Sequence, residues 1–323
     1  MRRAGYAVAA GACAAGAARL AYSAMSRRPP GGPKAWSRTN HRGEPVTLLE
    51  GPAVAAGALA GVLAQAGLAQ AGLAQAGLVP ASGSPGASGP AGWRRAAAMV
   101  LGGTGAAAFG AYDDLAGSGD RRGFRGHLGA LRQGEVTTGA VKLGGIGVTG
   151  VVSAALAGGS PVDMIVNAGL VAGGANLLNL FDLRPGRAIK VAAASGVLLG
   201  AAGQDSVAAP LGAALALLPE DLGERAMLGD AGANALGAML GASAAGLSRP
   251  ARIALLAGIA GLTAASEKVS FTKVIARTPA LNWLDMLGRR PAPQPSDTES
   301  PETGPPAQQP LVTIPAQRPE SGG

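Results

Sequence analysis

The chain has 323 residues, of which 48% are hydrophobic and only 14% are charged, whereas a typical soluble domain carries about 25% charged residues. Too few charges are therefore available to cover the surface of an ordinary soluble globule. The net charge of +8 comes from arginines and lysines in short loops between apolar runs, a pattern that orients membrane proteins, so we expect no nucleic acid as a partner.

Nine apolar runs approach the length of about 20 residues that spans a bilayer. They cover residues 4–25, 46–79, 95–115, 138–157, 161–181, 188–203, 205–219, 231–247 and 251–268. Abundant glycine favours close helix packing within a membrane. The sequence thus predicts an all-α fold, a polytopic integral membrane helix bundle with about nine to ten transmembrane helices.

The loops between these runs differ in charge. If the runs alternate, residues 26–45, 116–137, 182–190, 220–230 and the tail after 268 share one side and hold most of the lysines and arginines. The positive-inside rule makes that side cytoplasmic. We expect a transmembrane domain over 1–270, an interfacial helix within 271–290 and a disordered, proline-rich cytoplasmic tail over 291–323.

The first of three polar clusters is Asp113-Asp114, which closes the third run. Carboxylates at a helix C-terminus meet the negative end of the helix dipole, so a positive group is expected beside them. Two interpretations remain open. The pair is a solvated acidic helix end, or one carboxylate holds a divalent cation while the other faces a substrate.

The second cluster, at the end of the fifth run, comprises Asn176, Asn179 and Asp182. Spacings of three residues keep these side chains roughly on one stripe of a helix. They form either a polar site or interhelical hydrogen bonds that hold membrane helices together.

The third cluster opens the eighth run with Gly229 and Asp230. Asp230 is either a helix N-cap or a carboxylate that recruits a metal beside a phosphate-binding helix N-terminus. The predicted topology places all three clusters on the cytoplasmic side. Because polar groups at the edge of a membrane span are costly, their coincidence predicts a functional site.

Cationic residues accompany these clusters. The loop residues Arg121, Arg122, Arg125, His127 and Arg132 are typical of an anchor on anionic lipid. Lys142, Arg184 and Arg187 adjoin the acidic clusters, so we expect them to contact phosphate.

Together, the motifs Asp-Asp at 113–114, Asn-x-x-Asn-x-x-Asp at 176–182 and Gly-Asp-x-Gly-x-x-x-Leu-Gly at 229–237 resemble a known family. They are similar to the motifs of the polyprenyl-phosphate N-acetylhexosamine-1-phosphate transferases. That family includes phospho-N-acetylmuramoyl-pentapeptide transferase and the UDP-GlcNAc:undecaprenyl-phosphate transferases. The resemblance covers roughly residues 30–270 and marks the chain as a divergent member.

The resemblance implies an activity: Mg²⁺-dependent transfer of a sugar 1-phosphate from a UDP-sugar to a polyprenyl phosphate such as undecaprenyl phosphate, with release of UMP. It also implies a role in peptidoglycan or other cell-envelope glycan synthesis, at a bacterial plasma membrane with the active site facing the cytoplasm. The expected partners are the lipid phosphate, the UDP-sugar and the bilayer, with a homodimer as one option.

The resemblance also implies residue roles. Asp114 and Asp230 would bind Mg²⁺, and Asp113 would deprotonate or position the lipid phosphate. The expected substrate contacts are Lys142, Asn176, Asn179, Asp182, Arg184, Arg187 and Gly229.

Several positions depart from the family pattern. Pro185 stands where the family has a second aspartate, Met227 replaces an aromatic residue, and residues 266–277 contain no histidine. These departures keep open an alternative of a different class, a non-catalytic scaffold or lipid-phosphate-binding protein of the same fold. A transporter is less favoured, because the polar groups gather at one interface instead of the midplane.

Overall fold

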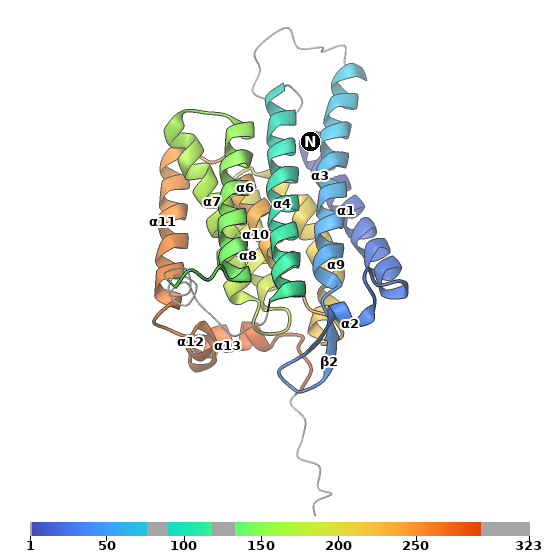
Figure 1. Cartoon of the computed structure of the whole chain (residues 1–323). Coiled ribbons are helices and arrows are strands. Elements are labelled where there is room, and N and C mark those ends of the chain that lie inside the picture. Colours follow the sequence, from blue (N-terminus) through green and yellow to red (C-terminus); the bar gives the residue numbers. More distant parts are fainter. Residues whose placement is uncertain (1, 76–89, 118–132, 292–323) are drawn as a thin grey trace, which may run out of the picture. The chain divides into compact units, whose positions relative to one another are not determined.

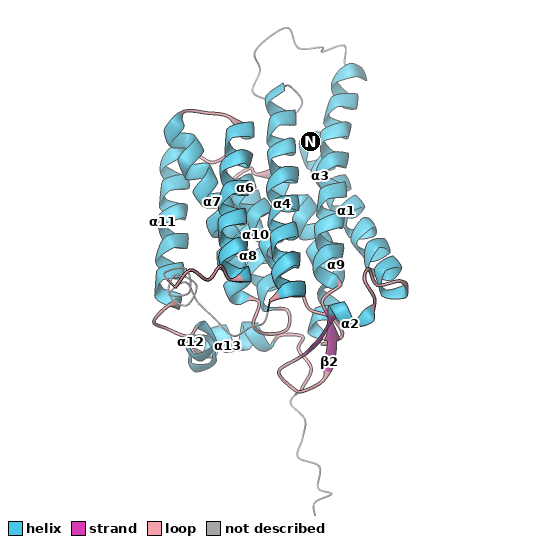
Figure 2. Cartoon of the chain, viewed as in Figure 1, coloured by secondary structure: helices cyan, strands magenta, loops and turns pink. Residues whose placement is uncertain are grey.

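The structure is a computed structural model that describes residues 2–75, 90–117 and 133–291. Within these ranges the chain forms twelve α-helices, one short 3₁₀ helix and two short strands (Figure 2). The predicted helical character is confirmed. Met1–Arg290 forms one compact unit, shown in Figure 1. The basic loop residues Arg121, Arg122, Arg125, His127 and Arg132, and nearly all of the tail, lie outside the described residues.

Each predicted apolar run coincides with a helix. In chain order these are α1 (Arg2–Arg27), α3 (Glu50–Gln75), α4 (Pro90–Ala116), α6 (Thr138–Ala157), α7 (Pro161–Phe181), α8 (Arg187–Ala201), α9 (Ala208–Leu222), α10 (Gly229–Ala244) and α11 (Arg249–Ser266). The 3₁₀ helix η1 (Asp205–Val207) precedes α9. Local capping explains the sharp start of α7, where Ser160 and Asp163 form a capping box.

Among the described residues, fewer than nine helices have the length and hydropathy expected of a membrane-spanning helix. Within these ranges they are Glu50–Ala71, Thr138–Ala157 and Pro161–Phe181, with a fourth if the bent pair α11 and α12 (Phe271–Arg277) counts as one. The helices α8 and α9 have 15 residues each, which gives a length of only about 22 Å. The structure therefore has several helices long and apolar enough to cross a membrane.

The N-terminal loop contains structure that the sequence did not predict. Strands β1 (Ser37–Thr39) and β2 (Pro45–Thr47) pair antiparallel after the short helix α2 (Pro33–Trp36). The Thr47 N–H donates to Arg225 O, and the Met227 N–H donates to Thr47 O, so β2 is also bonded to the segment before α10. The apolar run predicted from residue 46 is therefore wrong at its start. Residues 46 and 47 belong to strand β2, and α3 begins at Glu50.

After α11 the chain bends by 95° into α12 and continues as α13 (Pro279–Met286). The helix predicted within 271–290 is represented by the two short helices α12 and α13, and in α13 Trp283 is 65% exposed. Figure 1 shows α12, α13 and the β1–β2 hairpin at the same end of the bundle.

Helix α10 is the centre of the bundle and packs against α3, α4 and α7. It is almost entirely buried and consists mostly of glycine and alanine. A Cβ atom placed on Gly174 of α7 would lie 2.6 Å from the carbonyl oxygen of Gly237. Small residues therefore allow α7 and α10 to approach until their backbones touch.

Candidate functional site

The seam between α4 and α6 sets the register of the site. The ring of Phe109 lies where a Cβ atom on Gly145 would be, so a bulky residue on α4 fits a gap on α6. One turn further along the antiparallel pair, Asp113 lies opposite Lys142, with 2.7 Å between Oδ2 and Nζ. Packing along the seam thus brings together two residues that are far apart in the sequence.

Lys142 joins two of the predicted acidic clusters. Its ammonium contacts Asp113 Oδ2 and also donates a short hydrogen bond to Asp230 Oδ2. All three side chains are less than one quarter exposed. Buried charges require partners, and two carboxylates here share one ammonium. The positive group expected beside Asp113 is confirmed as Lys142.

Asp114 caps a helix that is distant in sequence. Its carboxylate accepts the backbone N–H groups of Asp230 (3.1 Å) and Ala231 (2.9 Å). The residue at the N-cap of α10, Leu228, has no side-chain acceptor, so Asp114 from α4 satisfies these donors. The alternative in which Asp230 is the N-cap is wrong, because Asp230 lies inside the first turn of α10.

Gly229 makes this arrangement possible. Its φ of +59° lies in the left-handed region, which side-chain-bearing residues disfavour. A Cβ atom at this position would lie 3.0 Å from both Asp114 Oδ2 and Leu48 Cδ2. Gly229 therefore shapes the start of α10 through its backbone.

Arg38 in β1 also reaches this site, although the sequence indicated it only as one of several basic loop residues. Its guanidinium donates a short hydrogen bond to the carbonyl oxygen of Asp114 and a 2.7 Å bond to Ser37 O. A carbonyl near a helix C-terminus lacks an intrahelical donor, so an arginine is a favourable partner. Arg38 thus holds the N-terminal hairpin against the end of α4.

The cluster at the end of α7 adjoins the site in part. Asp182, the C-cap of α7, lies near the backbone of Gly229. Burial raises the pKa of Asp182 well above its usual range, and the carboxylates of Asp221, Asp230 and Asp114 add to this shift.

Asn176 and Asn179, from the same cluster, are half-buried on α7. No hydrogen bond of their side chains occurs within the described part of the chain. Their roles in substrate binding stay predictions.

A small pocket of about 50 Å³ lies beside Asp182. It is lined by Asn40, His41, Val46, Asp182, Arg184, Pro185, Asp221, Glu224, Ala226 and Met227. Of the predicted phosphate contacts, Arg184 therefore faces the same space as Asp182.

Arg187, in contrast, has a partner elsewhere. Its Nε and Nη2 atoms donate to the two carboxylate oxygens of Asp285 at 2.7 and 2.9 Å, and Nη1 donates to Thr272 Oγ1. Both side chains of the ion pair are almost fully buried. This bidentate pair connects α8 to α13, so a phosphate contact by Arg187 stays a prediction with a competing structural partner.

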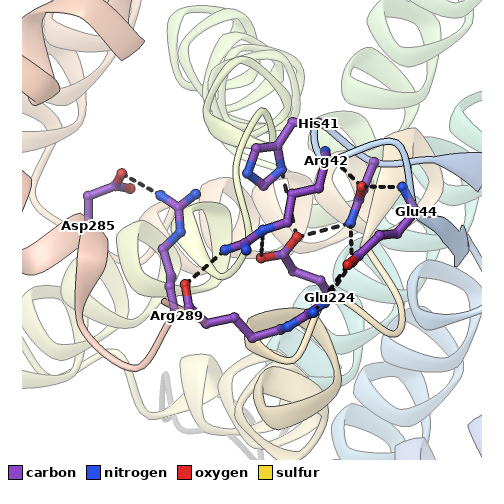
Figure 3. A network of polar contacts seen from close by, with 8 residues as sticks. His41, Arg42, Glu44, Glu224, Asp285 and Arg289 are labelled. Carbon is purple, nitrogen blue, oxygen red and sulfur yellow. Dashed lines mark hydrogen bonds and ion pairs between the residues drawn. The ribbon is translucent and has the colours of Figure 1, made fainter. Parts of the chain in front are cut away.

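A polar network joins the hairpin loop to the segment after α9, as Figure 3 shows. At its centre Glu224 is buried, with a backbone φ of +56° that is unusual for a residue with a side chain. Asn40 Nδ2 donates to its carboxylate at 2.9 Å, and Arg42 Nε lies 2.9 Å from it. The pKa of His41 is lowered, mainly by burial and then by the charge of Arg184.

The same network extends to the end of the compact unit. Arg290 pairs with Glu44 at 2.6 Å, and Arg289 pairs with Asp285 at 2.8 Å (Figure 3). The hydrogen bonds from Arg290 hold the pKa of Glu44 below its usual range. The hairpin, the segment around Glu224 and the end of α13 are therefore linked at the end of the bundle that carries the site.

Two further acidic residues were not singled out from the sequence. Glu50, in the first turn of α3, is fully buried, and neither of its carboxylate oxygens has a hydrogen-bond partner among the residues that the structure describes. Asp221, near the end of α9, is 2% exposed, and within the described ranges its Oδ2 atom also has no hydrogen-bond partner. The only sequence signal for Glu50 was an ionisable residue within an apolar run.

The carboxylates of Asp113 and Asp230 fit a magnesium ion if the phosphates of a substrate supply its remaining ligands. Asp113 and Asp230 already converge on one cation, the Lys142 ammonium. Mg²⁺ is commonly held by one or two carboxylates together with substrate phosphates. Among the described residues, no three acidic, histidine or cysteine side chains gather to hold a metal without such help. Asp114 is less available to bind a metal ion than the sequence led us to expect, because its two carboxylate oxygens already accept hydrogen bonds from backbone N–H groups.

No protein-family model and no curated protein matches the sequence.

Proposed function

We propose that this protein transfers a sugar 1-phosphate from a UDP-sugar to a membrane polyprenyl phosphate, with release of UMP, at the cytoplasmic side of a bacterial plasma membrane. The observation that carries the proposal is the Lys142 bridge between Asp113 and Asp230. This bridge unites two of the three motifs that resemble the transferase family. The bundle would cross the membrane nine times, with the shorter helices α8 and α9 packed inside it.

The reaction requires two phosphate groups to meet although both are negative. An oxygen of the lipid phosphate attacks the β-phosphorus of the UDP-sugar, a new P–O bond forms, and the bond to the UMP oxygen breaks as UMP leaves with its electron pair. The Lys142 ammonium would attract the lipid phosphate and offset its repulsion from the diphosphate. When bound, Mg²⁺ would supply further positive charge at the diphosphate.

The three aspartates would then have different tasks. Asp113 lies beside Lys142 and would position the attacking phosphate, while Asp230 would hold the cation at the diphosphate. Asp114 would act as a positioning residue, since it fixes the start of α10 and thereby the place of Asp230. This differs from the expectation that Asp114 binds Mg²⁺ directly.

Release of UMP from a panel of UDP-sugars tests the proposal. Purified protein in detergent would be supplied with Mg²⁺ and undecaprenyl phosphate. Asp113→Asn and Asp230→Asn should each lower UMP release by at least about 100-fold. Asp205→Asn, a carboxylate change at the other end of the bundle, is the control and should retain activity. A folded wild-type protein that releases no UMP from any donor would refute the transferase.

A second candidate is a non-catalytic protein that binds lipid phosphate. It is favoured by the Lys142 ammonium itself, which already neutralises part of the acidic site without a metal. Saturable binding of undecaprenyl phosphate that is unaffected by Mg²⁺ and by Asp230→Asn, without UMP release, would support this candidate.

A further inference from the structure

A polar cavity lies at the end of the bundle opposite the candidate site. Its volume is about 200 Å³, and it is partly open to the surface between α3, α4, α6, α7 and α10. Arg95 on α4 lines the cavity and precedes Asp113 by 18 residues, a separation of about 27 Å along the helix. The cavity is therefore distinct from the charged site at Lys142.

Part of the cavity wall is polar although it is deeply buried. Ser153 and Ser243 line the cavity and are 1% and 3% exposed. Ser153 Oγ donates to Ala98 O at 2.8 Å, and Ser243 Oγ donates to Met239 O at 2.9 Å. Each hydroxyl thereby uses its hydrogen, but its oxygen retains the capacity to accept a hydrogen bond. The two serines can therefore accept a hydrogen bond from a bound molecule.

Asn167, which is 5% exposed, contributes the complementary group to this wall. Its Oδ1 accepts a 2.8 Å hydrogen bond from Arg252 Nη1. A side-chain amide also has two N–H donors, and among the described residues Asn167 Nδ2 donates to no acceptor. A buried donor without a partner costs free energy. A hydroxyl group, which both donates and accepts, would pair with Asn167 and with the serines.

The mouth of the cavity carries a positive charge that no described residue neutralises. The other arginines at this end of α4 and α11 have partners within the protein, namely Arg94, Arg249 and Arg252. Arg95 is exposed and, within the described ranges, forms neither a hydrogen bond nor an ion pair. Asp205 also lines the cavity, but no ion pair links it to Arg95. An unpaired guanidinium at a polar cavity favours an anionic ligand, and its planar fork of donors fits phosphate oxygens.

The remaining polar residues of the lining are amides and hydroxyls, and the space that they enclose is small. They are Tyr6, Gln65, Gln204 and Ser206. The cavity is larger than the roughly 30 Å³ that one water molecule occupies and smaller than the about 300–1,000 Å³ of sites for drug-sized ligands. It therefore has room for a small polar group and not for a nucleotide-sugar.

We propose that this cavity binds a phosphate ester of a polyol, such as glycerol phosphate, either as the headgroup of a lipid or as a free molecule. The phosphate lies at the mouth beside Arg95, and the hydroxyls reach inward to Asn167 and the two serines. This order follows from burial, because Arg95 is exposed whereas the other three side chains are at most 5% exposed. The proposal does not depend on the transferase, since the cavity lies at the other end of the bundle.

Native mass spectrometry of the full-length protein in detergent tests the proposal. Phosphatidylglycerol, whose headgroup is a glycerol phosphate, should bind at one saturable site. Phosphatidylcholine, whose headgroup has a phosphate but no hydroxyl, should bind about tenfold more weakly. Equal binding of the two lipids would overturn the proposal. A cavity that takes up neither phosphatidylglycerol nor glycerol 3-phosphate holds water only, and that result would also overturn it.

Glycerol 3-phosphate distinguishes the two sources of the ligand. If an excess of this soluble ester displaces phosphatidylglycerol from the saturable site, the cavity accepts the free molecule. If phosphatidylglycerol binds and is not displaced, the ligand is a lipid headgroup whose chains contribute to binding. Either result supports a site for a polyol phosphate and identifies its source.

Two neighbouring arginines provide a matched pair of variants. Arg95→Gln and Arg94→Gln each remove one positive charge from an exposed position at the same end of α4, but Arg94 does not line the cavity. We expect Arg95→Gln to weaken binding about tenfold, because a charge-assisted hydrogen bond is lost, and Arg94→Gln to change it less than about twofold. Equal losses would indicate a general attraction to positive charge and would overturn the proposal.

The buried part of the cavity is tested by filling it. Ala157→Leu places a larger side chain in the cavity, whereas Ala155→Leu places the same side chain on the exposed face of α6, away from the lining. Ala157→Leu should abolish saturable binding of phosphatidylglycerol, and Ala155→Leu should retain it. Thermal unfolding in detergent shows whether both variants fold. Undiminished binding by a folded Ala157→Leu variant would place the ligand outside the cavity.

Discussion

The carboxylate of Asp114, near the C-terminus of α4, accepts the backbone N–H of Asp230 at 3.1 Å in the first turn of α10. Two helix ends with opposite partial charges therefore meet, and a carboxylate from one helix caps the other. Because Asp230 is itself a candidate ligand, this contact links the stability of α10 to the geometry of the site.

Replacement of Asp114 tests that link. Asp114→Ala removes the acceptor of two N–H groups and should lower the free energy of unfolding by about 1–2 kcal/mol. Asp114→Asn keeps one oxygen acceptor and should lose less. Thermal unfolding of both variants in detergent measures the difference, and equal losses would argue against capping by this carboxylate.

Lys142→Met should leave Asp113 and Asp230 facing each other without a cation. We expect a loss of roughly 3 kcal/mol in the free energy of unfolding, because a largely buried charge pair is broken. If the two carboxylates can hold Mg²⁺, the ion should raise the unfolding temperature of the variant more than that of the wild type. A shift of the same size in both proteins would indicate that Mg²⁺ does not bind between these carboxylates.

Variants of the Arg187–Asp285 pair distinguish a structural role of Arg187 from a role in binding substrate. If Arg187 serves the fold, Arg187→Met and Asp285→Asn should each destabilise the protein by about 3 kcal/mol, and a double-mutant cycle should show strong coupling. If Arg187 instead contacts phosphate, Asp285→Asn should leave the KM for the UDP-sugar unchanged while Arg187→Met raises it. Unfolding measurements and donor titrations distinguish the two cases.

His41, which is partly exposed, should titrate below the ordinary range of histidine. Burial and the Arg184 charge lower its pKa in the folded protein, so the folded state binds fewer protons than the unfolded state as the pH falls. The resulting stability is present above the unfolded pKa and is lost as the pH falls below it.

In a His127→Gln background His41 is the only histidine, and NMR can follow its titration. Arg184→Met should raise its midpoint, because a nearby positive charge is removed. An ordinary midpoint in the background protein, or no change with Arg184→Met, would contradict this account.

Membrane topology can be tested around α8, a helix of 15 residues. In a Cys13→Ser background, Leu183→Cys should react with a membrane-impermeant maleimide only from the cytoplasmic side. Ala202→Cys, at the other end of α8, should react only from outside. Reaction of both positions from one side would show that α8 does not cross the bilayer and would reduce the number of spans.

The sequence by itself determined the helices and the positions of the acidic clusters within them. Hydrophobic runs and capping residues such as Ser160 act over a few residues, so α6 and α7 were predicted with correct ends. The β1–β2 hairpin was missed because its partners, including Arg225 and Met227, lie far along the chain.

Only the tertiary structure decided which charges meet. The sequence led us to expect a positive group beside Asp113, but many lysines and arginines were available, and packing along the α4–α6 seam selected Lys142. Likewise, a helix N-terminus usually takes its cap from its own chain segment, whereas close approach of α4 and α10 gave that role to Asp114, 116 residues before Asp230. Such contacts depend on how side chains of different size fit between helices, and local sequence does not contain that information.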